Sequence, residues 1–139
     1  MKARVRLRGF EEQRRLWRSL PRDLAQATQD EAADPIAAAA AADIRAGYPR
    51  RTGALAAGVQ VEDVPRAAVQ AAARVVNTHP LAGLFEHGTQ ARHTALGANR
   101  GSMPAGNVFI PRIQRALAAF WSRVGPIMER AGLRVTGSA

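Results

Sequence analysis

The residues of this chain best suited to chemistry are a glutamate and three histidines in its second half. Glu86 and His87 are adjacent, and His79 and His93 lie close by in the sequence. A carboxylate beside imidazoles is the donor set of many zinc sites and of general acid–base catalysis. The H-E-x-x-H spacing that places such groups one helical turn apart is absent. Neighbouring side chains point in different directions on a helix or strand, so we expect a structural or interfacial role for Glu86.

Other catalytic signatures are also missing. The segment 97–101, Gly-Ala-Asn-Arg-Gly, has two glycines but neither the lysine nor the preceding strand of a phosphate-binding loop, and no G-x-S-x-G motif occurs. The chain has no cysteine, which excludes disulfides, thiolate zinc sites and cysteine nucleophiles. We therefore expect no enzyme, no catalytic residue, no cofactor and no metal. A metal-dependent hydrolase built on Glu86 and His87 is the least favoured alternative.

The elements that must position these residues begin with a strand and a long helical region. Charged and apolar residues alternate over 2–8, which is the period of a half-buried strand. A helical stripe follows and ends at Gly47, with interruptions at Pro21 and Pro35. We expect a short helix, a turn, and a second long helix that restarts or kinks at Pro35. The alanine-rich run 37–42 is interpreted as a packing seam, with disorder as the minority interpretation. The stripe consists of Leu16, Leu20, Leu24, Ala27, Ile36, Ala40 and Ile44.

The second half of the chain predicts a hairpin and a C-terminal helix. Residues 58–62 alternate in polarity, and residues 69–77 read as a returning strand after a turn at 63–66. The alanines of 69–77 favour a helix, but the β-branched pair at its end favours a strand. A helical stripe covers 113–131, and we expect Gly125-Pro126 to kink or end that helix.

Together these patterns predict an α+β fold. A small antiparallel sheet, made of the N-terminal strand and the hairpin, packs with the long N-terminal helical region and the C-terminal helix. With 139 residues, 47% of them hydrophobic, the chain has material for one modest core, so we expect a single domain over 1–139 with a frayed tail at 135–139. A polar loop at about 90–107 is too poor in apolar residues to order except against a partner.

The charge is strongly positive and unevenly distributed. The net charge is +9, with eight basic residues up to Arg22 and then five acids without a base from Asp23 to Asp43. This polarity suits subunits that stack basic end on acidic end, or a basic face lining something anionic. Arginine-rich, alanine-rich usage is also typical of GC-biased genomes, so a sequence-independent DNA-binding protein is only an alternative function. No apolar run approaches the length of a membrane span, and we expect a soluble protein without a classical secretion signal.

Three motifs resemble the small head-to-tail joining, or tail-completion, proteins of long-tailed bacteriophages. Residues 49–55, Pro-Arg-Arg-Thr-Gly-Ala-Leu, match the P-x-x-T-G-x-L turn of that family. Residues 81–89, Leu-Ala-Gly-Leu-Phe-Glu-His-Gly-Thr, match its Y-A-x-x-x-E-x-G-T segment, with leucine where tyrosine is usual. Residues 103–111 match its apolar-proline step into a C-terminal helix. The resemblance covers nearly the whole chain, with the motifs in order.

The resemblance implies a structural virion protein without catalysis. It implies an α+β subunit that forms a homo-oligomeric ring in the neck, at the head-proximal end of the tail, joining head to tail around the DNA channel. The partners would be further copies of the chain, neighbouring connector or stopper, tail terminator and tail tube proteins, and genomic DNA bound without sequence specificity, with no membrane. The chain would be assembled in the host cytoplasm and located in the virion. A tail terminator ring is the alternative within the neck.

The resemblance also implies which residues meet other subunits. We expect ring contacts from the turn, from the glutamate segment and its loop, and from the step into the last helix: Thr52, Gly53, Glu86, His87, Gly88, Thr89, Arg92, Arg100, Phe109 and Pro111. The N-terminal arginines are candidates for contact with DNA in the channel or with an acidic partner: Arg4, Arg6 and Arg8.

Overall fold

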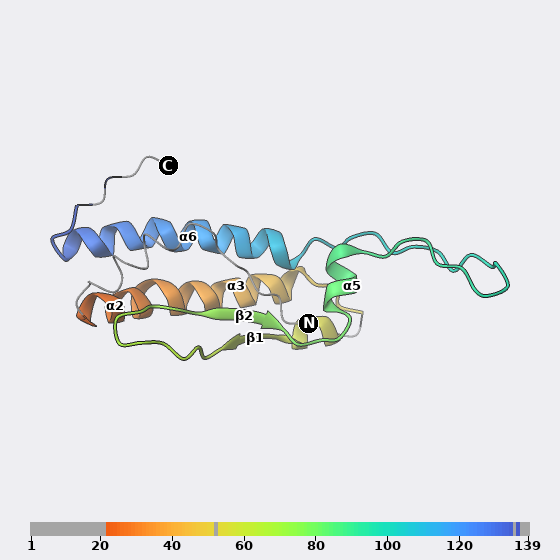
Figure 1. Cartoon of the computed structure of the whole chain (residues 1–139), viewed down its shortest axis with the longest axis horizontal. Coiled ribbons are helices and arrows are strands. Elements are labelled where there is room, and N and C mark those ends of the chain that lie inside the picture. Colours follow the sequence, from red (N-terminus) through yellow and green to blue (C-terminus); the bar gives the residue numbers. More distant parts are fainter. Residues whose placement is uncertain (1–21, 52, 135, 137–139) are drawn as a thin grey trace.

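The computed structural model describes residues 22–51, 53–134 and 136, and they form an α+β fold (Figure 1). Helices and a two-stranded antiparallel sheet make up the body. The predicted strand 2–8, with Arg4, Arg6 and Arg8, lies outside the described residues, as does Thr52. The elements in chain order are α2 (Arg22–Thr28), η1 (Gln29–Ala33), α3 (Asp34–Gly47), α4 (Ala54–Ala57), β1 (Val59–Glu62), β2 (Arg74–Asn77), α5 (Ala82–His87) and α6 (Phe109–Arg130).

The first helical region runs on through Pro35 as α2, η1 and α3 in direct succession. Proline lacks an N–H group and its ring crowds the preceding turn, which is why the sequence predicts a restart or kink there. The chain accommodates Pro35 with a wider π-helical turn directly before it, in which the Asp34 N–H donates to the Gln29 carbonyl oxygen. The interruption is therefore a local widening of one long helix.

The long helix lies between α6 on one side and the sheet on the other, as Figure 1 shows. Its apolar face contributes to two core clusters. The first joins residues of α2, η1 and α3 to α6 and contains Leu24, Ala32, Ile36, Val124 and Ile127. The second lies at the other end of α3 and contains Ala41, Ile44, Tyr48, Val59, Val108 and Phe109. Three alanines of the run 37–42 are buried, which fits a packing seam.

The predicted hairpin is present, with a wider connection than expected. β1 and β2 pair antiparallel, with Val59 opposite Asn77 and Glu62 opposite Arg74. The turn expected at 63–66 is the start of a connection that runs over 63–73. The buried side chain of Gln29 holds this connection, because its Nε2 donates to the Ala72 carbonyl oxygen at 3.0 Å and its Oε1 accepts from the Ala72 N–H at 2.8 Å.

Helix α6 continues through Gly125-Pro126 to Arg130, so of the two outcomes predicted for this dipeptide, a kink or a helix end, the helix end is wrong. Val124 and Ile127, on either side of the dipeptide, are buried against the first helical region. Burial of two such side chains gains about 3 kcal/mol or more, which offsets most of the cost of an interior proline.

Between α5 and α6 the chain leaves the body as a long two-stranded arm, residues 89–103, which Figure 1 shows projecting from one end. The Thr89 N–H donates to the Met103 carbonyl oxygen at 2.8 Å, and further pairs follow up to the Thr94 N–H and the Ala98 carbonyl oxygen at 2.9 Å. The polar loop predicted to order only against a partner thus has cross-strand hydrogen bonds of its own.

Candidate functional site

The base of the arm is organised around the buried carboxylate of Glu86. Its Oε2 accepts the N–H groups of Val108 and Phe109, both at 2.9 Å, and its Oε1 accepts the Ile110 N–H at 2.9 Å. The side chain comes from α5, and its three donors form the start of α6. Glu86 therefore caps a helix that begins 23 residues later in the chain.

The Glu86 carboxylate stabilises α6 because it lies at the N-terminal end of that helix. The first N–H groups of a helix have no partner within the helix, and the helix dipole is positive at that end. The Glu86 side chain is only 2% exposed, so water cannot replace it as the acceptor. The carboxylate thereby fixes α5, the returning strand of the arm and the start of α6 to one another.

Backbone contacts around Glu86 make the base tighter. The Gly106 N–H donates to the Phe85 carbonyl oxygen at 2.8 Å. A Cβ at Gly106 would lie 2.2 Å from the Phe85 ring, and a Cβ at Gly88 would lie 2.6 Å from the Met103 carbonyl oxygen. Gly88 also has a φ of 73°, which L side chains rarely adopt. Both glycines are required by this close approach of chain segments.

A second buried polar group lies beside the base. The Asn77 Nδ2 donates to the Tyr48 hydroxyl at 3.0 Å and to the Leu55 carbonyl oxygen at 3.1 Å, while its Oδ1 accepts the His79 N–H. The Tyr48 ring packs edge-on against Phe85 with centroids 5.5 Å apart. Burial raises the pKa of Tyr48, and Glu86 adds to the increase, whereas the hydrogen bond from Asn77 and the charge of Arg112 act against it.

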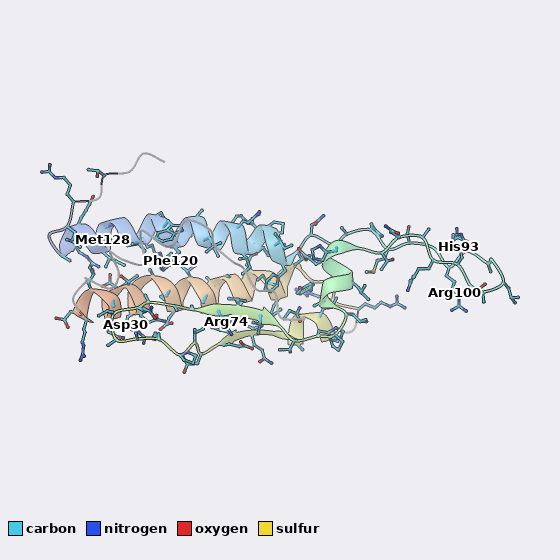
Figure 2. All side chains as sticks on the ribbon, in the orientation of Figure 1. Asp30, Arg74, His93, Arg100, Phe120 and Met128 are labelled. Carbon is cyan, nitrogen blue, oxygen red and sulfur yellow. The ribbon has the colours of Figure 1, made fainter. Side chains whose placement is uncertain are left out.

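The arm presents two cations on neighbouring strands. The Arg100 N–H donates to the Arg92 carbonyl oxygen at 2.6 Å, and the Arg92 N–H donates to the Gly101 carbonyl oxygen at 3.1 Å, so the two arginines lie opposite each other. Both are exposed and make no ion pair with any described residue. In Figure 2 Arg100 and His93 point to opposite sides of the arm. No acidic residue occurs between His87 and Met128, so the arm carries uncompensated positive charge.

The structure corrects two of the predicted ring contacts. Glu86 and Phe109 are buried in their own subunit, at 2% and 5% exposure, because one caps α6 and the other packs in the second core cluster. Neither side chain is therefore available at the surface for the direct contact that the sequence predicts. Three predicted contacts are exposed on the arm or beside its base: His87, Arg92 and Arg100.

The other predicted contacts divide between turn, base and helix start. Gly53 has a φ of 68° and precedes α4. Gly88 and Thr89 are half-buried at the arm's base, where the Thr89 Oγ1 accepts the Met103 N–H at 2.9 Å. Pro111 lies exposed in the first turn of α6, where a missing N–H group costs little.

Sequence reasoning did not single out Asn77 or Gly106. Asn77 ends a short strand, which gave no sign that its amide would join the turn, Tyr48 and His79. Gly106 was one of several glycines in a polar tract. The positive φ of 48° at the adjacent Asn107 marks the same tight return of the chain, and the Gly-Asn pair is the signal from which a turn here follows.

The described residues contain neither a cluster of metal-ligating side chains nor a helix that could span a membrane. Among them, no group of three or more histidines and carboxylates could hold a metal ion. Glu86 and His87 are not brought together, since the carboxylate is engaged by α6 and His87 is exposed. Within the same part of the chain, no helix combines the length and apolarity needed to cross a bilayer.

Comparisons of the chain with protein-family models, curated proteins and solved structures find no match.

Proposed function

We propose that this chain is a structural protein of a long-tailed phage particle. It would form a homo-oligomeric ring in the neck or at the head-proximal end of the tail and join head to tail around the DNA channel. No catalysis, cofactor or metal is part of this proposal. The arm would contact a neighbouring subunit or an adjacent ring.

The convergence of the three resembling motifs carries the proposal. Leu55 of the first, Phe85 of the second, and Val108 and Phe109 of the third pack into the same core cluster. Glu86 of the second motif accepts three N–H groups of the third. Motifs that are separate in sequence therefore build one structural unit, the base of the arm. A unit of this kind holds a projecting element in a fixed direction, which suits assembly better than chemistry.

The arm itself supports an assembly role. Between Gln90 and Ser102 no side chain is buried, and only Thr94 is half-buried. An isolated two-stranded ribbon without an apolar face is marginally stable in water. Such an element gains most of its stability when another protein surface covers it.

The test removes the arm and keeps its base. Residues 90–102 are replaced by Asn-Gly, because the pairing of Thr89 with Met103 allows a two-residue turn. We expect the wild-type chain to form a discrete oligomer by light scattering after size exclusion, and the shortened chain to remain folded but monomeric. A wild-type chain that stays monomeric at high concentration would contradict the proposal.

A further inference from the structure

An open cleft lies at the end of the body opposite the arm. It has a volume of about 580 Å³ and is formed by the start of α2 and the first part of the connection between the strands. In Figure 1, α2 and this connection lie at one end of the molecule and the arm projects from the other. One copy cannot fill its own cleft with its own arm.

The cleft combines an apolar part with carboxylates. Its apolar lining comes from the connection: Val64, Pro65, Ala67 and Ala68. Asp23 and Asp63 also line it, and neither forms an ion pair with a described residue. Arg22 and Arg66 complete the charged rim. The cleft can therefore take a segment with an apolar side chain between two cations. The apolar side chain would contact the apolar lining, and the cations of that segment would face Asp23 and Asp63.

The tip of the arm has this composition. Leu96 is 97% exposed, the most exposed of the large hydrophobic side chains in the described residues. Arg92 and Arg100 each lie four residues from Leu96, one on either strand. The tip segment contains no acid, so nothing in the arm itself neutralises these cations.

We infer that the arm of one copy docks in the cleft of the next, with Leu96 against the apolar lining and Arg92 and Arg100 near Asp23 and Asp63. This inference rests on the proposed ring and names the two surfaces that would join its subunits. The seven steps from Thr89 to Leu96 extend the arm by about 23 Å at about 3.3 Å per residue, so its tip projects away from the body (Figure 1). Because the two surfaces differ and lie at opposite ends, the contact is head-to-tail, and it generates a ring if the rotation closes.

The absence of cysteine from the chain allows a direct crosslinking test. Leu96→Cys and Ala67→Cys are made in separate chains, one with a size tag, and mixed under mild oxidation. We expect a disulfide-linked heterodimer on non-reducing gels. The matched control replaces Ala67→Cys by Ala118→Cys, an alanine in the middle of α6 that is also exposed. We expect no heterodimer from that mixture.

A charge swap tests the ionic part of the contact. The double reversal Arg92→Glu and Arg100→Glu, placed in the Leu96→Cys chain, should reduce the heterodimer yield several-fold. Adding Asp23→Arg and Asp63→Arg to the Ala67→Cys chain should restore it. Failure of the second pair to rescue the first would overturn the assigned pairing of arm and cleft.

The outcomes separate this inference from the proposed function. An oligomer that forms without a crosslink between positions 96 and 67 overturns the inference and leaves the ring standing. A chain that never assembles overturns both.

Two alternative contacts would also overturn the inference. If the arm instead binds duplex DNA, the crosslink is absent. Replacing both arginines then lowers the slope of log DNA affinity against log salt concentration by about 1.8. If residues 1–21 of the same chain occupy the cleft, Ala67→Cys is shielded in the monomer, which also overturns it.

Discussion

Removal of the Glu86 carboxylate should destabilise the whole base of the arm. In Glu86→Ala the N–H groups of Val108, Phe109 and Ile110 lose their acceptor. The first two residues are buried, at 7% and 5% exposure, so water does not reach their N–H groups easily. The perturbation therefore tests whether a side chain on α5 holds the start of α6.

The expected magnitude follows from the groups left unpaired. Each buried donor without an acceptor costs about 1–3 kcal/mol, and loss of a negative charge at a helix start costs about 0.3–1 kcal/mol. Two buried donors and the helix dipole give about 2–7 kcal/mol for Glu86→Ala. Glu86→Gln keeps one carbonyl oxygen but turns an N–H₂ group toward other donors, and we expect it to cost about 1–3 kcal/mol.

Urea unfolding followed by circular dichroism measures both variants, and the midpoints should fall in the order wild type, Gln, Ala. Glu129→Gln is the matched control, because Glu129 is exposed near the end of α6 and no described residue pairs with its carboxylate. We expect the control to lie within about 0.5 kcal/mol of wild type. A Glu86→Ala variant as stable as this control would refute the capping argument.

Three further predictions concern the base and the strand connection. Tyr48 is the single tyrosine of the chain, so tyrosinate absorbance should report its raised pKa directly. Because the folded state favours the neutral phenol, Tyr48 contributes stability that is complete below the ordinary tyrosine pKa and is lost as pH rises through the folded-state pKa. Tyr48→Phe should therefore remove the part of the alkaline loss in unfolding free energy that comes from this group. Gly88→Ala should lower the unfolding midpoint more than Gly97→Ala at the arm's tip, because both have positive φ but only the first meets backbone atoms; equal midpoints would show that φ alone matters. Gln29→Ala should abolish hydrogen-exchange protection of the Ala72 N–H while that of the Val76 N–H in β2 persists, and unchanged protection at Ala72 would contradict the role of the side chain.

The helices and the hairpin were predictable because their signals are local. The apolar stripe of α6 and the β-branched Val75-Val76 each report a period that the final structure keeps. A helix end at Gly125-Pro126, one of the two outcomes predicted there, does not occur because backbone propensity competes with burial, and the burial of Val124 and Ile127 depends on a distant helix. The connection over 63–73 likewise depends on Gln29, which is remote in the sequence.

The sequence points to the segment around Glu86, but it predicts a subunit contact through this side chain, which the structure instead buries as a helix cap. The sequence marks Glu86 as a carboxylate without a catalytic partner, and this supports a structural role. The sequence does not reveal that the Glu86 carboxylate oxygens face the start of α6. A cap that joins two residues 22 positions apart leaves no local pattern in the sequence. Exposure of Arg92 and Arg100 was easier to anticipate, since a polar tract without acids cannot bury them.

We propose that this chain joins heads to tails as a ring. The most direct measurement uses particles assembled without the chain, to which purified protein is added before electron microscopy. We expect separate heads and tails without the protein, joined particles with it, and ring-shaped density of this chain at the junction. Heads and tails that join equally well without the chain would contradict it.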